Sequence, residues 1–194
     1  MEEKIKKILD GLLGKILRII FLPAILFVAW SEREWQTIRR QRLIKKLDAA
    51  DPSTLALYGK IDIACPENCH IGYHVAIHDA DWNASGQITI GNYVYFGPRV
   101  NILTISHNIE GNKIPYDPTY VYKPVVIEDF VWVGTDVVIA PGTHIEEGAV
   151  IAMGSTISGR IPKGAIVGNQ KFRILKYRDM EKYESLKAEK KFHA

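Results

Sequence analysis

The stretch from Ile127 to Pro162 repeats with a period of six residues. Aliphatic residues stand at positions 127, 133, 139, 145, 151 and 157. An α-helix repeats near 3.6 residues and a strand alternates with a period of two, so neither explains this spacing. A small or aliphatic residue follows each leading position by four: Val131, Val137, Thr143, Ala149, Ser155 and Ile161. The pattern predicts a parallel β-helix in which each six-residue unit forms one face and one turn, with the leading side chain inward.

The same spacing continues upstream, with one irregularity. The leading residues there are Ile71, Ile77, Ala84, Ile90, Phe96 and Ile102. One extra residue between Ile77 and Ala84 predicts a bulge or a short loop. The 24 residues between Ile102 and Ile127 cannot be wound in register without losing the inward set. We therefore expect residues 106–124 to leave the coil as an extruded loop.

Length and composition indicate one folded domain with appendages. The chain has 194 residues, of which 47% are hydrophobic and 24% charged. We expect a helical segment over residues 1–50, an all-β solenoid over 51–168, and a tail with a short helix over 169–194. Two regions at the ends are basic, with 11 Lys and Arg against 6 acids in residues 1–48 and 10 against 4 in residues 160–194. The solenoid is acidic, which does not fit a nucleic-acid surface on the folded body.

The N-terminus combines an amphipathic and an apolar segment. Ile5, Leu9, Leu12 and Ile16 follow helical spacing, and residues 19–30 contain no charge but include Pro23. Twelve residues are too few to cross a bilayer, which takes about 20. Two interpretations follow. One is a helical hairpin packed on the prism and bent at the proline. The other, which we favour, is a peripheral or monotopic anchor of residues 1–48 on the inner face of the cell membrane of a cytoplasmic protein.

The anchor hypothesis assigns roles to residues after the apolar run. Tryptophans would lie at the membrane interface, and arginines and lysines would face anionic headgroups. The residues concerned are Trp30, Trp35, Arg39, Arg40, Arg42, Lys45 and Lys46.

A metal site is not expected. Cys65 and Cys69 form one CxxxC pair close to His70, His74 and His78. In a helix the three histidines would share a face, but the six-residue register scatters them over different faces. The chain also has no HxxxxH pair of the kind found in carbonic anhydrases of the β-helical type.

Three stretches carry a resemblance to a known family. They are ISHN at 105–108, YKPVVIEDFVWVG at 122–134 and IPKGAIVGNQKFRILKYR at 161–178. Together with the phased repeat they resemble the hexapeptide-repeat O-acetyltransferases of the galactoside, maltose and nodulation-factor type, over roughly residues 55 to 178. The resemblance implies a left-handed β-helix, a homotrimer, and acetyl-coenzyme A as donor. Left-handedness comes from the resemblance alone, because parallel crossovers are generally right-handed.

Acetyl transfer to a hydroxyl requires a base for the hydroxyl proton and donors for the oxyanion. It needs neither a metal nor a covalent enzyme intermediate. Histidine suits the base because its unperturbed pKa lies near 6.5. His107 stands where the coil gives way to the extruded loop and coincides with the family's catalytic histidine. The alternative is a structural histidine at a loop root. We expect the other five histidines to be structural.

The acceptor pocket is expected to draw on the HDADWN segment. Asp79 and Asp81 are candidates to bind sugar hydroxyls, and Trp82 to stack on a ring face. In the family, carboxylate and Asn side chains of the neighbouring subunit face the catalytic histidine, which Asp79 matches best and Asn83 less well. The alternative is that these residues merely line an outward corner. Glu110 either orients the imidazole or is a solvated loop acid.

The resemblance also assigns residues to coenzyme A, in a groove between two prisms. Trp132 occupies the family's position for a tryptophan beside the pantetheine arm, and Thr135 and Ser158 match positions that meet that arm. Lys171 and Arg173 lie near the family's basic residue for the nucleotide phosphates. The stretch GNQKFR departs from the family pattern, because it lacks the proline and is one residue longer. Which cation meets the phosphates therefore stays open.

We conclude from the sequence that the chain is an O-acetyltransferase acting on a saccharide or lipid-linked glycan precursor. Two alternatives remain. One is a soluble enzyme acting on a small free acceptor such as serine or a simple sugar, and the other is a membrane-tethered solenoid scaffold without catalysis. The sequence specifies neither the acceptor nor the length of the acyl group.

Overall fold

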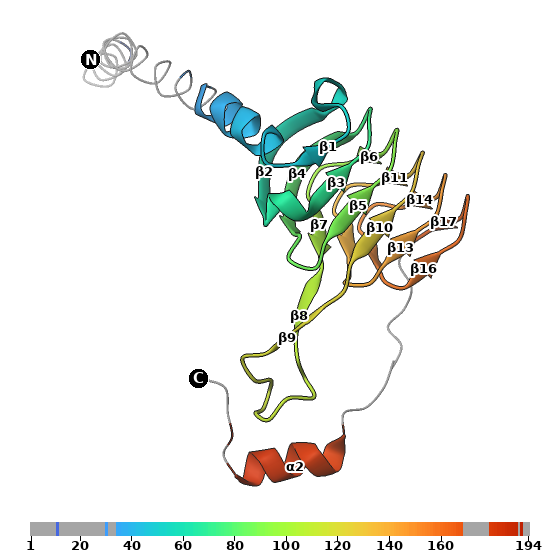
Figure 1. The fold of residues 1–194 in the computed structure, drawn as a ribbon. Coiled ribbons are helices and arrows are strands. Elements are labelled where there is room, and N and C mark those ends of the chain that lie inside the picture. The colour runs from blue at the N-terminus through green and yellow to red at the C-terminus, as the bar shows by residue number, and fades with distance from the viewer. Residues whose placement is uncertain (1–10, 12–29, 31–33, 169–178, 190, 192–194) are drawn as a thin grey trace, which may run out of the picture. The chain divides into compact units, whose positions relative to one another are not determined.

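The structure, a computed structural model, describes residues 11, 30, 34–168, 179–189 and 191 (Figure 1). The chain forms two compact units, Met1–Arg42 and Leu43–Ala194. Residues 34–44 are helical, and Leu43 and Ile44 pack against the core of the second unit. The predicted amphipathic and apolar segments lie outside the described residues, apart from Gly11 and Trp30. No helix in the part described is both long and apolar enough to cross a membrane.

The second unit is a solenoid with three parallel faces. The first face is a six-stranded sheet of β1 (Asp48–Ala49), β3 (Cys69–Ile71), β5 (Ile88–Ile90), β10 (Val125–Ile127), β13 (His144–Ile145) and β16 (Arg160–Ile161). The second face contains β6 (Tyr95–Phe96), β11 (Trp132–Val133), β14 (Val150–Ile151) and β17 (Ile166–Val167). The third contains β7 (Val100–Leu103), β12 (Val138–Ile139) and β15 (Thr156–Ile157). Short 3₁₀ helices, η1 (Pro52–Thr54) and η2 (Pro66–Asn68), precede β2 and β3.

Two long strands turn the corner between the second and third faces. β2 (Ala56–Ala64) and β4 (Ala76–Asn83) pair with each other along both faces. The first half of β4 then pairs with β6 and its second half with β7. Every pairing within the solenoid is parallel, as a coil that stacks on the next requires. β1 begins at Asp48, so the first coil starts within the segment predicted to be helical, 1–50.

The core confirms the period of six. The leading residues of the later coils all point inward and are at most 6% exposed: Ile127, Val133, Ile139, Ile145, Ile151 and Ile157. Each stacks on the equivalent residue of the next coil, as Ile127 pairs with Ile145 and Ile145 with Ile161. The predicted parallel β-helix of hexapeptide repeats is therefore the observed fold.

From the second coil onward, the corner between the first and second faces uses left-handed backbone. His74, Tyr93 and Phe130 have φ of 56°, 56° and 60°, and glycines occupy the same corner in the next two coils. Bulky residues rarely adopt this conformation. Here their rings stack outside the solenoid, with centroids 4.8 Å apart between His74 and Tyr93 and 5.5 Å apart between Tyr93 and Phe130.

The upstream register differs from the prediction at one coil. Trp82, and not Ala84, is the inward residue in line with Ile63 and Ile102. The corner that precedes Trp82 in β4 is one residue shorter than the same corner of β2. His78 pairs with Tyr58 and Ala80 pairs with Ile61, so β4 has one residue between its paired positions where β2 has two. Trp82 is 1% exposed and its Nε1 donates to the carbonyl of Val100 at 3.1 Å. The prediction that Trp82 stacks on a sugar is therefore wrong, because its ring fills the core.

The chain leaves the coil between Thr104 and Val125. β8 (Ile105–His107) and β9 (Tyr120–Tyr122) form an antiparallel hairpin that projects from the prism (Figure 1). The completely buried Thr104 fixes its root, since its hydroxyl donates to Asn83 O at 2.7 Å and accepts from Gly86 N at 2.7 Å. The predicted C-terminal helix is α2 (Met180–Ala188).

The position of Trp82 predicts a stability effect. Replacing Trp82 with Ala would leave a cavity in the core and remove the indole hydrogen bond, so we expect the free energy of unfolding to fall by about 3–5 kcal/mol. The neighbouring exposed change Asp81→Asn should alter it by less than about 0.5 kcal/mol. Denaturant unfolding followed by circular dichroism measures both. Equal stability of the two variants would show that the indole is not part of the core.

Candidate active site

His107 lies at the outer end of β8, on the projecting hairpin. Its imidazole stacks on the ring of Tyr116, with centroids 3.7 Å apart and planes 18° apart. The ring of Tyr120, directly across the hairpin, lies 4.9 Å away. Nδ1 of His107 is buried without a hydrogen-bond partner, whereas Nε2 is not sealed off in this way. The two tyrosines therefore hold a half-buried imidazole in one plane, with Nδ1 as its buried nitrogen.

A buried carboxylate organises the tip of this hairpin. Asp117 accepts hydrogen bonds from the hydroxyl of Thr119, from Asn112 N at 2.8 Å and from Thr119 N at 2.9 Å. These bonds, that of the Thr119 hydroxyl first, lower the pKa of Asp117 from 3.8 to about 2. Asn108 closes the neck, because its N–H donates to Thr119 O and its Nδ2 donates to Thr119 Oγ1, both at 3.1 Å. The hairpin is thus internally braced around His107.

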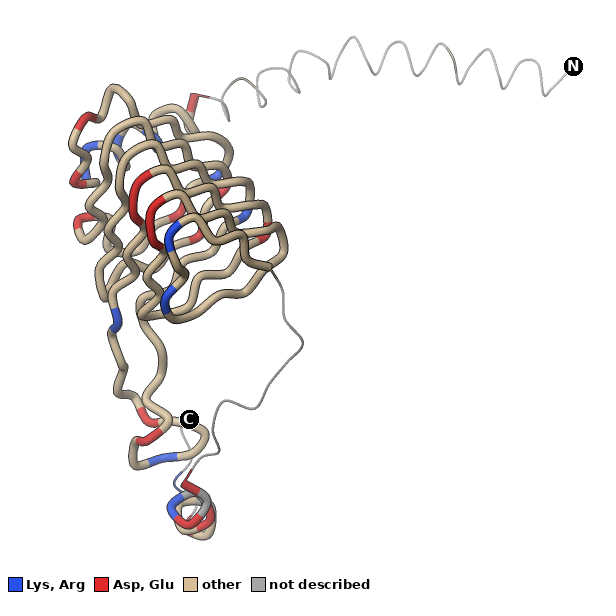
Figure 2. Tube along the Cα trace, turned by 90° about the vertical axis from the view of Figure 1, so that its right-hand side faces the viewer, with Lys and Arg blue, Asp and Glu red and all other residues tan. Residues whose placement is uncertain are grey.

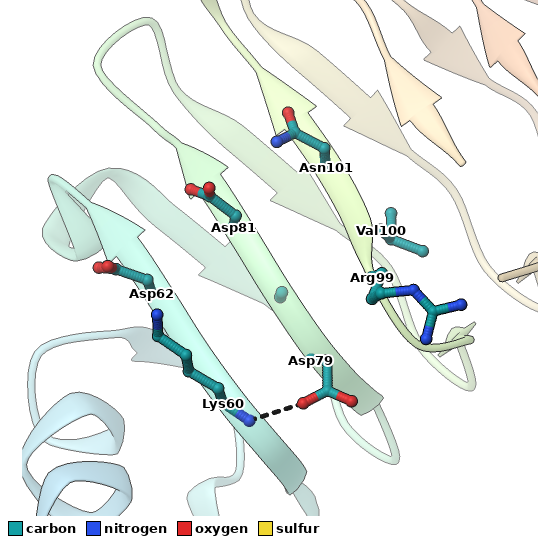
Figure 3. Close-up of a pocket in the computed structure, with 8 residues that line it drawn as sticks. Lys60, Asp62, Asp79, Asp81, Arg99, Val100 and Asn101 are labelled. Atoms are coloured by element: carbon teal, nitrogen blue, oxygen red, sulfur yellow. Dashed lines mark hydrogen bonds between the residues drawn. The ribbon is translucent and has the colours of Figure 1, made fainter. Parts of the chain in front are cut away.

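A polar groove of about 460 Å³ crosses the third face of the first coils (Figure 3). It is lined by Lys60, Asp62, Asp79, Ala80, Asp81, Arg99, Val100 and Asn101. The outward residues Asp62, Asp81 and Asn101 are partners in register on adjacent strands. Two carboxylates therefore stand about one strand spacing, ~4.8 Å, apart and face solvent. A groove with this lining suits a ligand rich in hydrogen-bonding hydroxyl groups.

The corner of the groove is held by backbone geometry. Asp79 has a φ of 39°, and its Oδ1 accepts a hydrogen bond from Lys60 N at 2.7 Å. Gly59 permits this approach, because a Cβ at that position would lie 1.9 Å from Asp79 Oδ1. Arg99 is engaged by Asp136, with Nε and Nη2 donating at 2.7 and 2.8 Å. This pair lowers the pKa of the Asp136 carboxyl by hydrogen bonding.

Two of the predicted acceptor residues, Asp79 and Asp81, share this groove. Asn83 does not line it; its Oδ1 accepts from Ser85 N at the far end of β4. Glu110 is exposed at the hairpin turn, and His107 Nδ1 has no hydrogen-bond partner, so Glu110 does not orient the imidazole through that atom.

The groove and His107 are separated within one chain. Asn101 at the groove and His107 lie six residues apart on a largely extended path, which amounts to about 20 Å. The described residues of a single chain therefore present a groove and an imidazole on separate parts of the molecule.

The predicted donor residues are spread over the second face and the two edges of the third face. Trp132 is 58% exposed on the second face, in register with the exposed Tyr95. Thr135 follows at the corner before β12, whereas Ser158 follows β15 at the opposite edge of the third face. Backbone at Thr135 packs on Gly97, where a Cβ would lie 2.8 Å from Thr135 N. Lys171 and Arg173 lie outside the described residues.

The remaining histidines of the solenoid have structural partners. His70 pairs with Asp48 at 2.6 Å and His144 with Glu128 at 2.7 Å. The latter contact lowers the pKa of Glu128. Figure 2 shows acidic positions side by side on successive coils. Glu128 and Glu147 lie close together on neighbouring coils, since Glu147 N donates to Glu128 Oε2 at 3.0 Å. Among the described residues, no group of three His, Cys, Asp or Glu side chains is placed to hold a metal ion.

Several groove residues escaped sequence analysis. Lys60 and Asp62 come from the coil before β4, and Arg99 and Asn101 come from the coil after it. The alternation in KIDIA, with Ile61 and Ile63 on one side and Asp62 on the other, was the available signal. This signal was not used, because the irregular register between β2 and β4 obscured which residues of neighbouring coils stack.

Comparison with known proteins agrees with this fold. The family model of the bacterial transferase hexapeptide (six repeats) matches residues 124–159. The galactoside O-acetyltransferase of Lactococcus lactis is 37% identical over 79 residues, which cover 41% of this chain and 38% of that protein. The galactoside O-acetyltransferase of Escherichia coli is 27% identical over 145 residues, covering 71% of this chain and 68% of that protein.

A solved structure extends the likeness over most of the solenoid. The hexapeptide-repeat acetyltransferase of Vibrio cholerae, solved with acetyl-coenzyme A, has a TM-score of 0.52 and 26% identity, and the match covers 75% of this chain and 88% of that one. The fold and the repeat define this chain as a hexapeptide-repeat protein. Its resemblance to the galactoside type of hexapeptide acetyltransferase, seen in the sequence, is confirmed by these relatives.

The bracing of the hairpin predicts a pH dependence. Because the folded-state pKa of Asp117 is depressed, its carboxylate stabilises the hairpin fully above pH 3.8, and this contribution is lost as pH falls toward 2. Thr119→Val removes the largest cause, so the pKa of Asp117 should rise toward 3.8. Carboxyl-carbon NMR titration measures the midpoint. The control Thr89→Val, on a solenoid strand, should leave it unchanged, and a midpoint near 3.8 in the unmodified protein would contradict the bracing.

Proposed function

We propose that this protein is an O-acetyltransferase that moves acetyl from acetyl-coenzyme A to a hydroxyl of a saccharide or glycan precursor. The observation that carries the proposal is the imidazole of His107, held between tyrosines on a hairpin that leaves the repeat at the family's catalytic position. The acetyl-coenzyme A complex of the Vibrio cholerae relative supports the donor.

The chemistry follows from the free nitrogen. Nε2 of His107 takes the proton of the acceptor hydroxyl while the oxygen attacks the thioester carbonyl. The resulting oxyanion collapses, the C–S bond breaks, and the coenzyme A thiolate takes the proton back from the imidazolium. This sequence requires that Nδ1 keep its proton. Among the described residues no acceptor for that proton is present, since Nδ1 is buried and unpartnered.

The complete site is proposed to form between two copies in a homotrimer. The groove and the imidazole of one chain are about 20 Å apart, so one acceptor sugar cannot meet both. In a trimer, the hairpin of one copy would face the groove of the next, and the donor would lie along the crevice between them. The spread of Trp132, Thr135 and Ser158 over separate edges fits such a crevice. A neighbour would also supply the partner for Nδ1.

The acceptor is proposed to lie against Asp79 and Asp81. Exposed carboxylates accept hydrogen bonds from sugar hydroxyl groups, and Asn101 beside them offers both a donor and an acceptor.

Association with the inner face of the cell membrane through residues 1–48 completes the proposal. Within the described part of this segment, Trp30 and Trp35 are 58% and 59% exposed. Exposed tryptophans beside arginines suit a membrane interface. A lipid-linked acceptor would then be presented at the same surface.

Substitution of His107 tests the chemistry. His107→Ala should lower kcat for acetyl transfer by about 10²- to 10⁴-fold, because general-base catalysis contributes that much. Thiol release from acetyl-coenzyme A, measured with a panel of lipid-linked and free glycans, follows the reaction.

His70→Ala is the matched control, since His70 pairs with Asp48 on the first face, away from the hairpin. It should keep full activity. Retained turnover in His107→Ala, with the oligomeric state unchanged by light scattering, would refute the assignment.

Co-sedimentation tests the membrane proposal. The full chain should pellet with vesicles containing anionic lipid and less with neutral vesicles, because basic side chains gain about 1 kcal/mol each near an anionic surface. Arg39→Glu combined with Arg42→Glu should release it. Recovery of the unmodified chain in the supernatant with both vesicle types would favour the soluble enzyme that acts on small free acceptors.

A further inference from the structure

The C-terminal helix contacts the tip of the His107 hairpin. Lys182, near the start of α2, donates from Nζ to the carbonyl of Glu110. Just past the end of the helix, the carbonyl of Lys191 accepts a hydrogen bond from Ile114 N at 2.7 Å. The two contacts bracket the hairpin turn and join segments about 70 residues apart in sequence.

Apolar burial accompanies these bonds. Ile114 and Leu186 are 7% and 9% exposed, yet neither belongs to the core of the solenoid. Leu186 lies four residues after Lys182 and therefore shares the helix face that reaches the hairpin. The two aliphatic side chains are thus removed from water at the same junction. The sequence predicted a short helix in this tail but did not indicate this burial.

Charge at the junction is complementary as well. The ammonium group of Lys182 lies close enough to Asp117 to contribute to lowering the pKa of that carboxyl, after the hydrogen bonds from Thr119 and Asn112. Lys182 therefore donates a hydrogen bond to the carbonyl of Glu110 and has a favourable charge interaction with the carboxylate of Asp117.

The residues of the hairpin that α2 contacts lie close in sequence to the two tyrosines that enclose His107. Ile114 precedes Tyr116 by two positions, and Tyr116 stacks on the imidazole at 3.7 Å. On the other side of the turn, Asp117 and Thr119 lead into Tyr120, which faces His107 across the hairpin. Anything that holds Ile114 and Asp117 therefore also restrains the two rings that enclose the imidazole.

We propose that α2 is a clamp on the hairpin and that Lys182 and Leu186 are positioning residues for His107. They act through Ile114, Asp117 and Tyr116 and touch neither the donor nor the acceptor. Without the clamp, the hairpin tip opens and the imidazole leaves its plane. The effect on catalysis rests on the proposed function, whereas the effect on the hairpin does not.

Hydrogen exchange of the full-length protein tests the clamp. In Leu186→Ala, and separately in Lys182→Met, amides in a peptide covering residues 108–120 should exchange about tenfold faster, because the buried contact or the charged bond is lost. Glu181→Ala changes an exposed residue of the same helix and should leave exchange unchanged. Peptides from the solenoid, such as residues 137–157, should be unaffected in all three variants.

Kinetics test the positioning role. Leu186→Ala should lower kcat about tenfold with KM for acetyl-coenzyme A unchanged, and Leu186→Met and Lys182→Arg should restore most of the rate. Unchanged exchange at 108–120 in both Leu186→Ala and Lys182→Met would overturn the clamp. Faster exchange with an unchanged kcat would overturn the positioning of His107. If the unmodified protein transfers no acetyl group, the proposed function fails while exchange still decides on the clamp.

Discussion

Stacking of one inward side chain on the next, coil after coil, is the constraint on which this structure depends. Each face offers its neighbour only two to four paired residues, so no coil is stable alone. The aliphatic column must continue in every turn of the solenoid, and an insertion cannot be absorbed within a face. The inserted residues can only leave the coil at a corner and return at the same position of the stack. The extra residues between Ile102 and Ile127 therefore project as a hairpin, and the hairpin carries His107.

Thr104 shows how the coil tolerates this departure. Its hydroxyl bonds the corner of the preceding coil, while its carbonyl accepts a hydrogen bond from Lys123 N at 2.9 Å on the returning strand. Val125 N then donates to Gln87 O, which resumes the ladder below β5. The ladder is thus continuous across the insertion, and the hairpin begins on a rigid base. A base of this kind lets distant contacts at the tip, such as those of Lys182 and Leu186, decide the position of the imidazole.

The sequence could predict what the period determines and little beyond it. Ile127 to Ile157 and the excursion after Ile102 were readable, because an inward position tolerates few residue types. The inward position of Trp82 could not be predicted, since the short corner at Asp79 shifts the register. Trp82 therefore takes the inward position that the period assigned to Ala84. The groove was hidden because Asp62 and Asp81 meet only across the stack, 19 residues apart. The contact of α2 with the hairpin was also hidden, since a charged helix with one buried leucine has no strong apolar face.

The same regularity explains why function concentrates at the irregular points. Successive coils present outward positions that are nearly equivalent, so a perfect repeat would offer a ligand many similar places and none that is preferred. The shortened corner at Asp79 and the departure at Thr104 break this equivalence, one with a groove and the other with a hairpin. Both lie within the first three coils, while the later coils keep a strict period and carry the predicted donor residues. The regular part thus suits a long, extended donor lying along stacked coils, whereas selection among acceptors requires the two places where the repeat fails.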